Sequence, residues 1–75
     1  MPWSARDLRT VLARAGFVEL RQRGSHLRLR RVAPSGAARY VTLPLHRGDL
    51  PAGTVKAIFR EAGLSEADAR RILRG

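Results

Sequence analysis

The feature that most constrains the fold is a run of three short segments in which apolar residues occupy alternate positions. The segments cover residues 17–23, 26–31 and 39–43. An apolar residue at every second position is the pattern of a half-buried β-strand. Gly24 separates the first two segments, and the turn sequence of residues 33–36 separates the last two. The pattern therefore predicts a three-stranded antiparallel meander with one polar and one apolar face.

Strand parity assigns side chains of the second and third segments to the two faces. The inward set of apolar residues is Leu27, Leu29, Val41 and Leu43. The outward set of the second segment is His26, Arg28 and Arg30. Tyr40 falls on the polar face by the same parity, where two roles stay open: stacking on a base, and packing over arginine stems. Val32 breaks the alternation, so the second strand is expected to bulge or end near Arg31.

The same parity divides the first segment. Val18 and Leu20 share one face, and the other face is shared by Glu19, Arg21 and Arg23. Pro44 lacks an N–H group for the sheet, so it is expected to end the third strand or to sit at its edge.

Helical patterns flank the three segments. Residues 4–15 open with a capping pattern, Ser4 three residues before Asp7, and carry an apolar stripe at helical spacing. Trp3 is expected to pack against the first turn of this helix, with an exposed contact and a place in a disordered end as the alternatives. A second helix is predicted from Gly53 to Gly63, followed by a short third helix over residues 65–73. We therefore expect an α+β fold of order α-β-β-β-α plus a short extra C-terminal helix, the layout of a double-stranded-RNA-binding domain.

The length and charge of the chain narrow the class of function. Seventy-five residues predict a single domain spanning residues 1–75. The chain lacks cysteine, a long apolar run and the apolar core of a signal peptide, so we expect no membrane association and a cytoplasmic location. Fifteen basic residues against six acidic ones indicate nucleic acid or another polyanion as the partner.

The basic charge is concentrated around one histidine. Residues 21–31 hold five arginines and His26, with no acidic residue. An imidazole titrates near neutral pH, so His26 can exchange a proton with a ribose hydroxyl or simply bind phosphate. Gly24 would let an RNA backbone approach closely, and two roles stay open for Ser25: donating to a phosphate or capping the turn.

The other histidine, His46, lies in the loop after the third strand. It is interpreted as structural or auxiliary, with a second acid/base role and a phosphate contact as the alternatives. Two histidines without carboxylates at ligand spacing make a poor metal site, so no metal and no small-molecule cofactor are expected.

The motifs in this order resemble a known family along nearly the whole chain. The resemblance is to the HicA-type toxins of bacterial HicA/HicB toxin–antitoxin pairs, which are mRNA-cleaving ribonucleases with a double-stranded-RNA-binding-domain-like fold. The motifs that carry it are the helix opening of residues 4–12 with Gly16-Phe17, the Arg21-Gln22-Arg23-Gly24-Ser25-His26 signature, Val41-Thr42-Leu43-Pro44 with His46, and the segments 50–54 and 62–65.

The resemblance implies a metal-independent mRNA endoribonuclease in which His26 is the catalytic residue. The positions implied to bind RNA are Arg21, Arg23, Gly24, Ser25, Arg28 and Arg30. It also implies a cognate HicB-like antitoxin protein that holds the enzyme inactive. The residues themselves leave two alternatives open: a non-catalytic RNA- or DNA-binding module using the same arginine face, and a bare interaction domain.

Overall fold

The computed structural model describes residues 2–75. The elements follow one another as α1 (Ala5–Arg14), β1 (Val18–Arg23), β2 (His26–Val32), β3 (Ala38–Pro44), α2 (Ala52–Ala62) and α3 (Glu66–Arg74). This order confirms the predicted α+β fold, including the short third helix.

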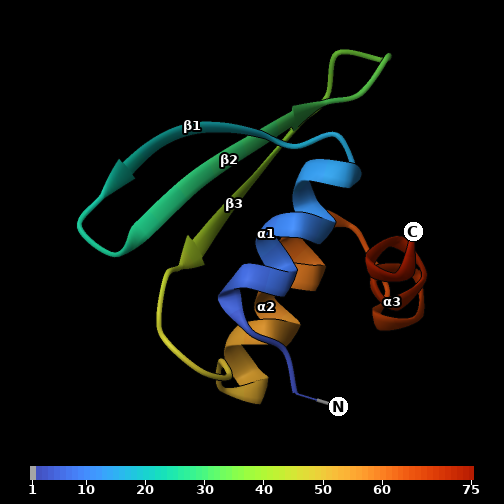
Figure 1. The fold of residues 1–75 in the computed structure, drawn as a ribbon. Coiled ribbons are helices and arrows are strands. Elements are labelled where there is room, and N and C mark those ends of the chain that lie inside the picture. The colour runs from blue at the N-terminus through green and yellow to red at the C-terminus, as the bar shows by residue number, and fades with distance from the viewer. Residues whose placement is uncertain (1) are drawn as a thin grey trace.

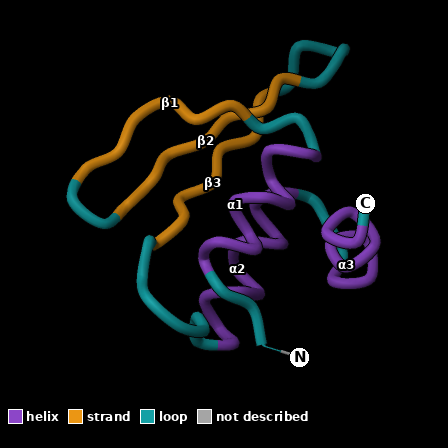
Figure 2. Tube along the Cα trace, viewed as in Figure 1, coloured by secondary structure: helices purple, strands orange, loops and turns teal. Residues whose placement is uncertain are grey.

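The sheet has two different faces. Its three strands are antiparallel in the order β1-β2-β3. Helices α1 and α2 cover one face, and α3 packs against α1 beside this layer (Figures 1 and 2). The opposite face of the sheet carries no helix, so the side chains on it are open to a ligand. We call it the open face.

The core lies between the sheet and the two helices. The predicted inward residues of β2 and β3 are all buried, which confirms their assignment. The core side chains of the sheet are Leu27, Leu29, Val41 and Leu43, and those of α1 and α2 include Leu8, Val11, Leu12, Val55, Ile58, Phe59 and Ala62. The apolar stripes of both helices therefore face the sheet, as amphipathic helices do in a two-layer domain.

The helix ends follow the predicted capping signals with one shift. The hydroxyl of Ser4 accepts a hydrogen bond from the backbone N–H of Asp7 at 3.0 Å. Gly63 ends α2 in the left-handed conformation with φ 71°. Helix α2 begins at Ala52 rather than Gly53, because Pro51 already holds φ at −57°, close to the helical value.

Strand β1 departs from the predicted alternation. Its register shifts between Glu19 and Arg21, so Leu20 is the extra residue of a β-bulge. Val18 pairs with Arg30 on the open face and is 63% exposed, whereas Glu19 is turned to the helix side. There both carboxylate oxygens of Glu19 accept from the Arg9 guanidinium of α1 at 2.7 Å. The predicted shared face of Val18 and Leu20, and that of Glu19 with Arg21 and Arg23, were wrong for this reason.

Strand β2 ends at Val32, so the predicted end near Arg31 is confirmed to within one residue. Its pairing with β3 continues without a shift to Val32 opposite Ala38, so the alternative of a bulge near Arg31 was wrong. Arg31 lies on the helix side, where its guanidinium carbon is 5.5 Å from the centroid of the Phe17 ring. The aliphatic stem and planar head of an arginine can cover an aromatic residue, so a basic residue is accommodated at this corner of the core.

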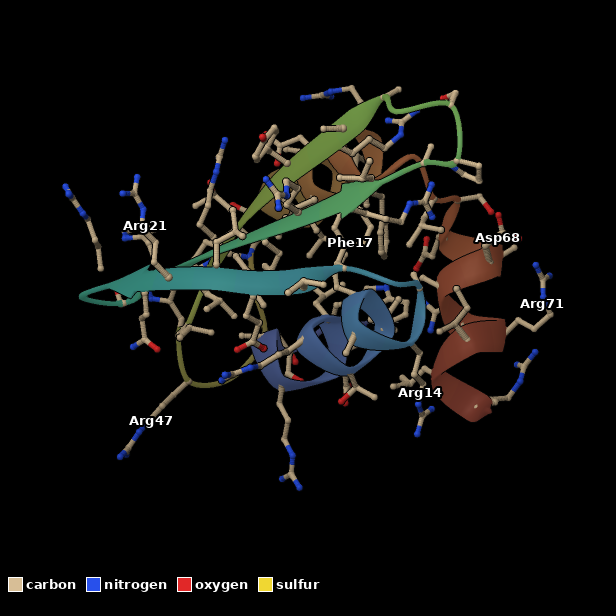
Figure 3. All side chains as sticks on the ribbon, turned by 90° about the horizontal axis from the view of Figure 1, so that it is seen from above. Arg14, Phe17, Arg21, Arg47, Asp68 and Arg71 are labelled. Atoms are coloured by element: carbon tan, nitrogen blue, oxygen red, sulfur yellow. The ribbon has the colours of Figure 1, made fainter. Side chains whose placement is uncertain are left out.

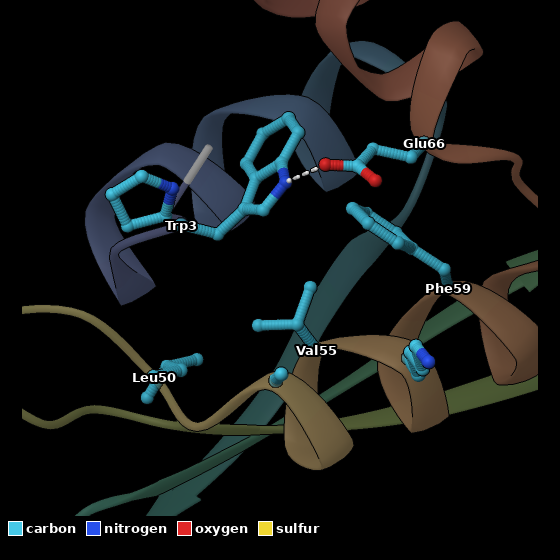
Figure 4. Close-up of a pocket in the computed structure, with 8 residues that line it drawn as sticks. Trp3, Leu50, Val55, Phe59 and Glu66 are labelled. Atoms are coloured by element: carbon cyan, nitrogen blue, oxygen red, sulfur yellow. Dashed lines mark hydrogen bonds between the residues drawn. The ribbon is translucent and has the colours of Figure 1, made fainter.

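Trp3 is packed, as predicted, but its ring and hydrogen-bond contacts are with α2 and α3 rather than with the first turn of α1. Its side chain is buried and meets the Phe59 ring edge-to-face at a centroid distance of 5.3 Å. The indole Nε1 donates to Glu66 Oε2 at 3.1 Å (Figure 4). The Arg70 guanidinium carbon lies 5.0 Å from the indole centroid. Trp3 thereby ties the N-terminal segment to α2 and α3.

Candidate nucleic-acid interface

The β1–β2 hairpin holds the histidine signature at its tip. Arg23 and His26 pair directly across the strands, and Gly24 and Ser25 form the two-residue loop between them. Gly24 has φ 55°, a conformation that L side chains adopt only with strain, and Ser25 does not share it. The Gln22 side chain donates to the Gly24 carbonyl at 2.9 Å and so braces the loop. The turn predicted at Gly24 is confirmed.

A hollow on the open face collects the basic side chains around His26. The residues that line it are Arg21, Arg23, His26, Arg28 and Thr42. The register explains the gathering, since Arg23 pairs with His26 and Arg21 pairs with Arg28. Side chains paired across antiparallel strands lie about 4.5–5.5 Å apart at Cβ. We call this hollow, with its five lining residues, the arginine–histidine hollow.

The cations of the open face are not neutralised by neighbouring acids. Within residues 2–75, the side chains of Arg21, Arg23, His26 and Arg30 make no hydrogen bond and no ion pair. Arg28 donates to Thr42 Oγ1 at 2.8 Å and lies over the Tyr40 ring. An array of unpaired guanidiniums on an exposed surface attracts phosphate groups.

The acidic residues with ion pairs lie elsewhere. Glu19 pairs with Arg9 on the helix side, and within α3 Glu66 pairs with Arg70 and Asp68 with Arg71. Figure 3 shows Arg21 projecting from the hairpin end and Asp68 and Arg71 at the opposite end of the molecule.

Hydrogen bonds lower the pKa of these three carboxyl groups. The Arg9 side chain lowers the pKa of Glu19. Trp3 first, and Arg70 second, lower the pKa of Glu66, and Arg71 lowers that of Asp68. The three carboxylates are thus held in their charged form by partners away from the open face.

His46 lies in a different hollow from His26. Its neighbours are Leu45 and the first turns of α1, and the hollow is lined by Ala5, Arg6, Arg9, Leu45 and His46. The structure therefore does not bring the two histidines of the sequence into one site. The Ser25 hydroxyl has no partner among residues 2–75 and so does not cap the turn, while the Ser25 carbonyl accepts from Leu45 N at 2.6 Å.

The hollow brings together most of the residues that the sequence singled out, plus one that it missed. Arg21, Arg23, His26 and Arg28 share it, whereas Arg30 lies farther along β2 on the same face. Thr42 was not predicted. Thr42 pairs with Arg28 across the strands. It follows Tyr40 by two residues, and this spacing could have placed it on the polar face with Tyr40.

The described residues offer neither a metal-binding cluster nor a membrane-spanning helix. No group of three or more His, Asp or Glu side chains in residues 2–75 is placed to hold a metal ion. No helix in the same range has the length and apolar character needed to cross a membrane.

Comparison with known proteins identifies the family. No curated protein matches the chain significantly. A family model described as the HicA toxin of bacterial toxin–antitoxin systems matches residues 5–64. This match covers all three strands, the arginine–histidine hollow, α1 and α2. The chain therefore belongs to the HicA toxin family.

Proposed function

We propose that this protein is a metal-independent mRNA endoribonuclease that acts as the toxin of a toxin–antitoxin pair, with His26 as its catalytic residue. The observation that carries the proposal is the position of His26. Its exposed imidazole lies among three guanidiniums in one hollow, at the tip of a braced hairpin. A proton-transferring group beside a set of phosphate-binding groups is the minimum needed for RNA strand cleavage.

The reaction proposed is attack of a ribose 2′-oxygen on the neighbouring phosphorus. The 2′-hydroxyl loses its proton, the new P–O bond forms, and the bond to the 5′-oxygen breaks as that oxygen gains a proton. His26 transfers one of these protons, and solvent water exchanges the other. The products are a 2′,3′-cyclic phosphate, or its hydrolysed form, and a 5′-hydroxyl end.

The arginines are proposed to bind the substrate and stabilise the charge that develops on the phosphorane oxygens. Guanidiniums suit this role because their planar N–H groups match two phosphate oxygens at once. Arg21, Arg23 and Arg28 border His26 and would act at the reacting phosphate, while Arg30 would bind a neighbouring one. Gly24 and Ser25 at the loop would allow close approach of the RNA backbone and offer a hydroxyl donor.

His46 is proposed to be auxiliary to the reaction. Its separate hollow beside Arg6 and Arg9 supports a role in ordering the loop or in a remote phosphate contact. Such a position does not suit the second proton transfer at the phosphate bound by His26.

The partner proposed is a HicB-like antitoxin protein. An acidic surface on it would neutralise the open face, where four guanidiniums stand without a carboxylate partner among the described residues. Covering this face would exclude RNA from His26 and thereby silence the toxin.

A cleavage assay with a defined single-stranded RNA tests the proposal. The purified protein is expected to cut the RNA equally well with and without excess EDTA, and to leave 2′,3′-cyclic phosphate and 5′-hydroxyl ends. Cleavage that EDTA abolishes and a divalent ion restores would refute the metal-independent reaction. Tight RNA binding without any strand scission would instead identify a non-catalytic binding module.

A further inference from the structure

The open face carries exposed aromatic and apolar side chains next to the arginine–histidine hollow. Tyr40 is 42% exposed, Val18 63% and Val32 55%. Arg30 lies in the middle strand, directly between Val18 of β1 and Tyr40 of β3. These side chains point away from the two helices and contribute nothing to the core, so a ligand can reach them.

Arg28 links Tyr40 to the hollow. Its guanidinium carbon is 5.0 Å from the centroid of the Tyr40 ring, and its Nη1 donates to Thr42 at 2.8 Å. The same arginine lines the hollow beside His26. Aromatic rings and guanidinium planes are the two protein surfaces on which unpaired nucleobases stack.

We propose that Tyr40, flanked by Arg28 and Arg30, binds a nucleobase of single-stranded RNA by stacking while the hollow binds the backbone phosphate at His26. The proposal rests on the function proposed above and names its substrate class. Bases in a duplex are stacked on one another and do not reach side chains on a flat sheet, so the substrate must be unpaired at this position.

The strand geometry places this base outside the scissile step. From His26 to Arg30, the cross-strand partner of Tyr40, β2 advances four residues, about 13 Å at 3.3 Å per residue. That distance is several times the roughly 3.4 Å spacing of successive phosphates along one strand of duplex DNA, and it leaves room for an intervening nucleotide in an unpaired strand. The stacked base therefore belongs to a flanking nucleotide, and it would influence which sequences are cut.

The mixture of charge and aromatic surface favours a nucleotide over an apolar protein segment. Val18 and Tyr40 each have Arg30 directly across the strands, and the Arg28 guanidinium lies over the Tyr40 ring, whereas Val32 pairs with Ala38. A nucleotide supplies a π-face and an anion in one unit, so it satisfies both. A purely apolar partner would remove water from these guanidiniums without replacing it by a charge.

Fluorine NMR tests the stacking at one residue, because Tyr40 is the chain's only tyrosine. Protein carrying 3-fluorotyrosine gives one resonance, and His26→Ala keeps the RNA intact. A short single-stranded RNA is expected to shift this resonance. A series of RNAs of the same length, each lacking a different base but keeping all phosphates, is then compared. The shift should disappear for the one RNA that lacks the base stacked on Tyr40. The proposal is overturned if the resonance does not shift on RNA binding. It is also overturned if every abasic RNA of the series shifts the resonance equally.

Affinity measurements with matched variants provide the second readout. Tyr40→Leu is expected to weaken RNA binding by about 5- to 150-fold, the range for one lost base–aromatic stack. Tyr40→Phe, which keeps the ring, should bind like the parent protein. The loss on Tyr40→Leu should vanish on RNA lacking the stacked base.

The outcomes separate this proposal from the nuclease function. A protein that does not cleave RNA but shows both stacking signatures supports the base site and refutes the enzyme. A protein that cleaves RNA, but whose Tyr40→Leu variant loses affinity only for the antitoxin, makes this patch a protein-docking surface and overturns the base site.

Discussion

The open-face arginines should set the salt dependence of RNA binding. Arg21, Arg23, Arg28 and Arg30 share this face without carboxylate partners among residues 2–75. Each phosphate neutralised on a single strand contributes about −0.7 to the slope of log affinity against log salt. Four such contacts give a slope of about −2.8, which is roughly a 50-fold loss of affinity between 50 and 200 mM salt.

The perturbation is the double substitution Arg21→Gln with Arg23→Gln. Removing two contacts should halve the slope to about −1.4, or roughly a sevenfold loss over the same salt range. The control is Arg71→Gln with Arg74→Gln in the last turn of α3, which removes the same number of charges. Figure 3 shows Arg71 at the end of the molecule opposite the hairpin.

Fluorescence anisotropy of a labelled single-stranded RNA measures the slopes, with His26→Ala in every protein to prevent cleavage. The hairpin pair is expected to flatten the slope and the α3 pair to leave it unchanged. Equal flattening by both pairs would mean that net charge, rather than the open face, binds the RNA. An unchanged slope in the hairpin pair would remove Arg21 and Arg23 from the interface.

Three further predictions concern stability, measured by urea denaturation. Gly24→Ala should lower the free energy of unfolding by about 1–2 kcal/mol, because φ 55° strains an L residue while the added Cβ meets nothing within 4 Å. Gly53→Ala in α2 should instead raise it by about 0.5–1 kcal/mol, and a loss of stability there would contradict the backbone argument. The pKa of Glu66 is lower in the folded protein than in the unfolded chain, where it is about 4.3. The Glu66 carboxylate therefore stabilises the fold above about pH 4.3, and this contribution is lost as the pH falls through the pKa of the folded state. Glu66→Gln should therefore lose less stability than wild type between pH 7 and pH 3, whereas Glu61→Gln, which removes no ion pair, should behave as wild type.

Local sequence signals were enough for most elements. The hydroxyls of Ser4 and Ser65 cap α1 and α3, each with an acidic residue three positions later. The alternation of Leu27, Leu29 and their partners on β3 placed the core face of the sheet. These features depend on neighbours within one turn or one strand, so a single sequence can report them.

The features that the sequence did not predict depend on contacts between distant elements. The bulge in β1 places Glu19 against Arg9 of the first helix, and no pattern within β1 reports a partner in another element. Arg31 covers the Phe17 ring on the helix side, a contact outside β2 that no pattern within β2 reports. Thr42 joins the hollow through its cross-strand pairing with Arg28, which requires the register of β2 against β3.

For the proposed site, too, local patterns predicted some placements, and others depended on contacts between distant elements. Parity placed His26, Arg28 and Arg30 on one face correctly, because β2 is regular. The parity of β1 was wrong for Val18 and Glu19, which lie on the open face and the helix side, respectively. The bulge at Leu20 shifts the register by one residue, so Arg21 and Arg23 still lie on the open face, as predicted. The separation of His46 from His26 required the path of the loop after β3.

The most direct test of the catalytic role is the cleavage rate of His26→Ala on one defined RNA, relative to wild type and to His46→Ala. The His26 side chain contacts no other described side chain by hydrogen bond or ion pair, so its removal should leave the circular-dichroism spectrum and urea midpoint unchanged. His26→Ala is expected to cut the RNA about 10²- to 10⁴-fold more slowly, the contribution of a positioned proton-transfer group. His46→Ala should retain most of the activity. A folded His26→Ala protein that cleaves RNA at the wild-type rate would contradict the assignment of His26 as the catalytic residue.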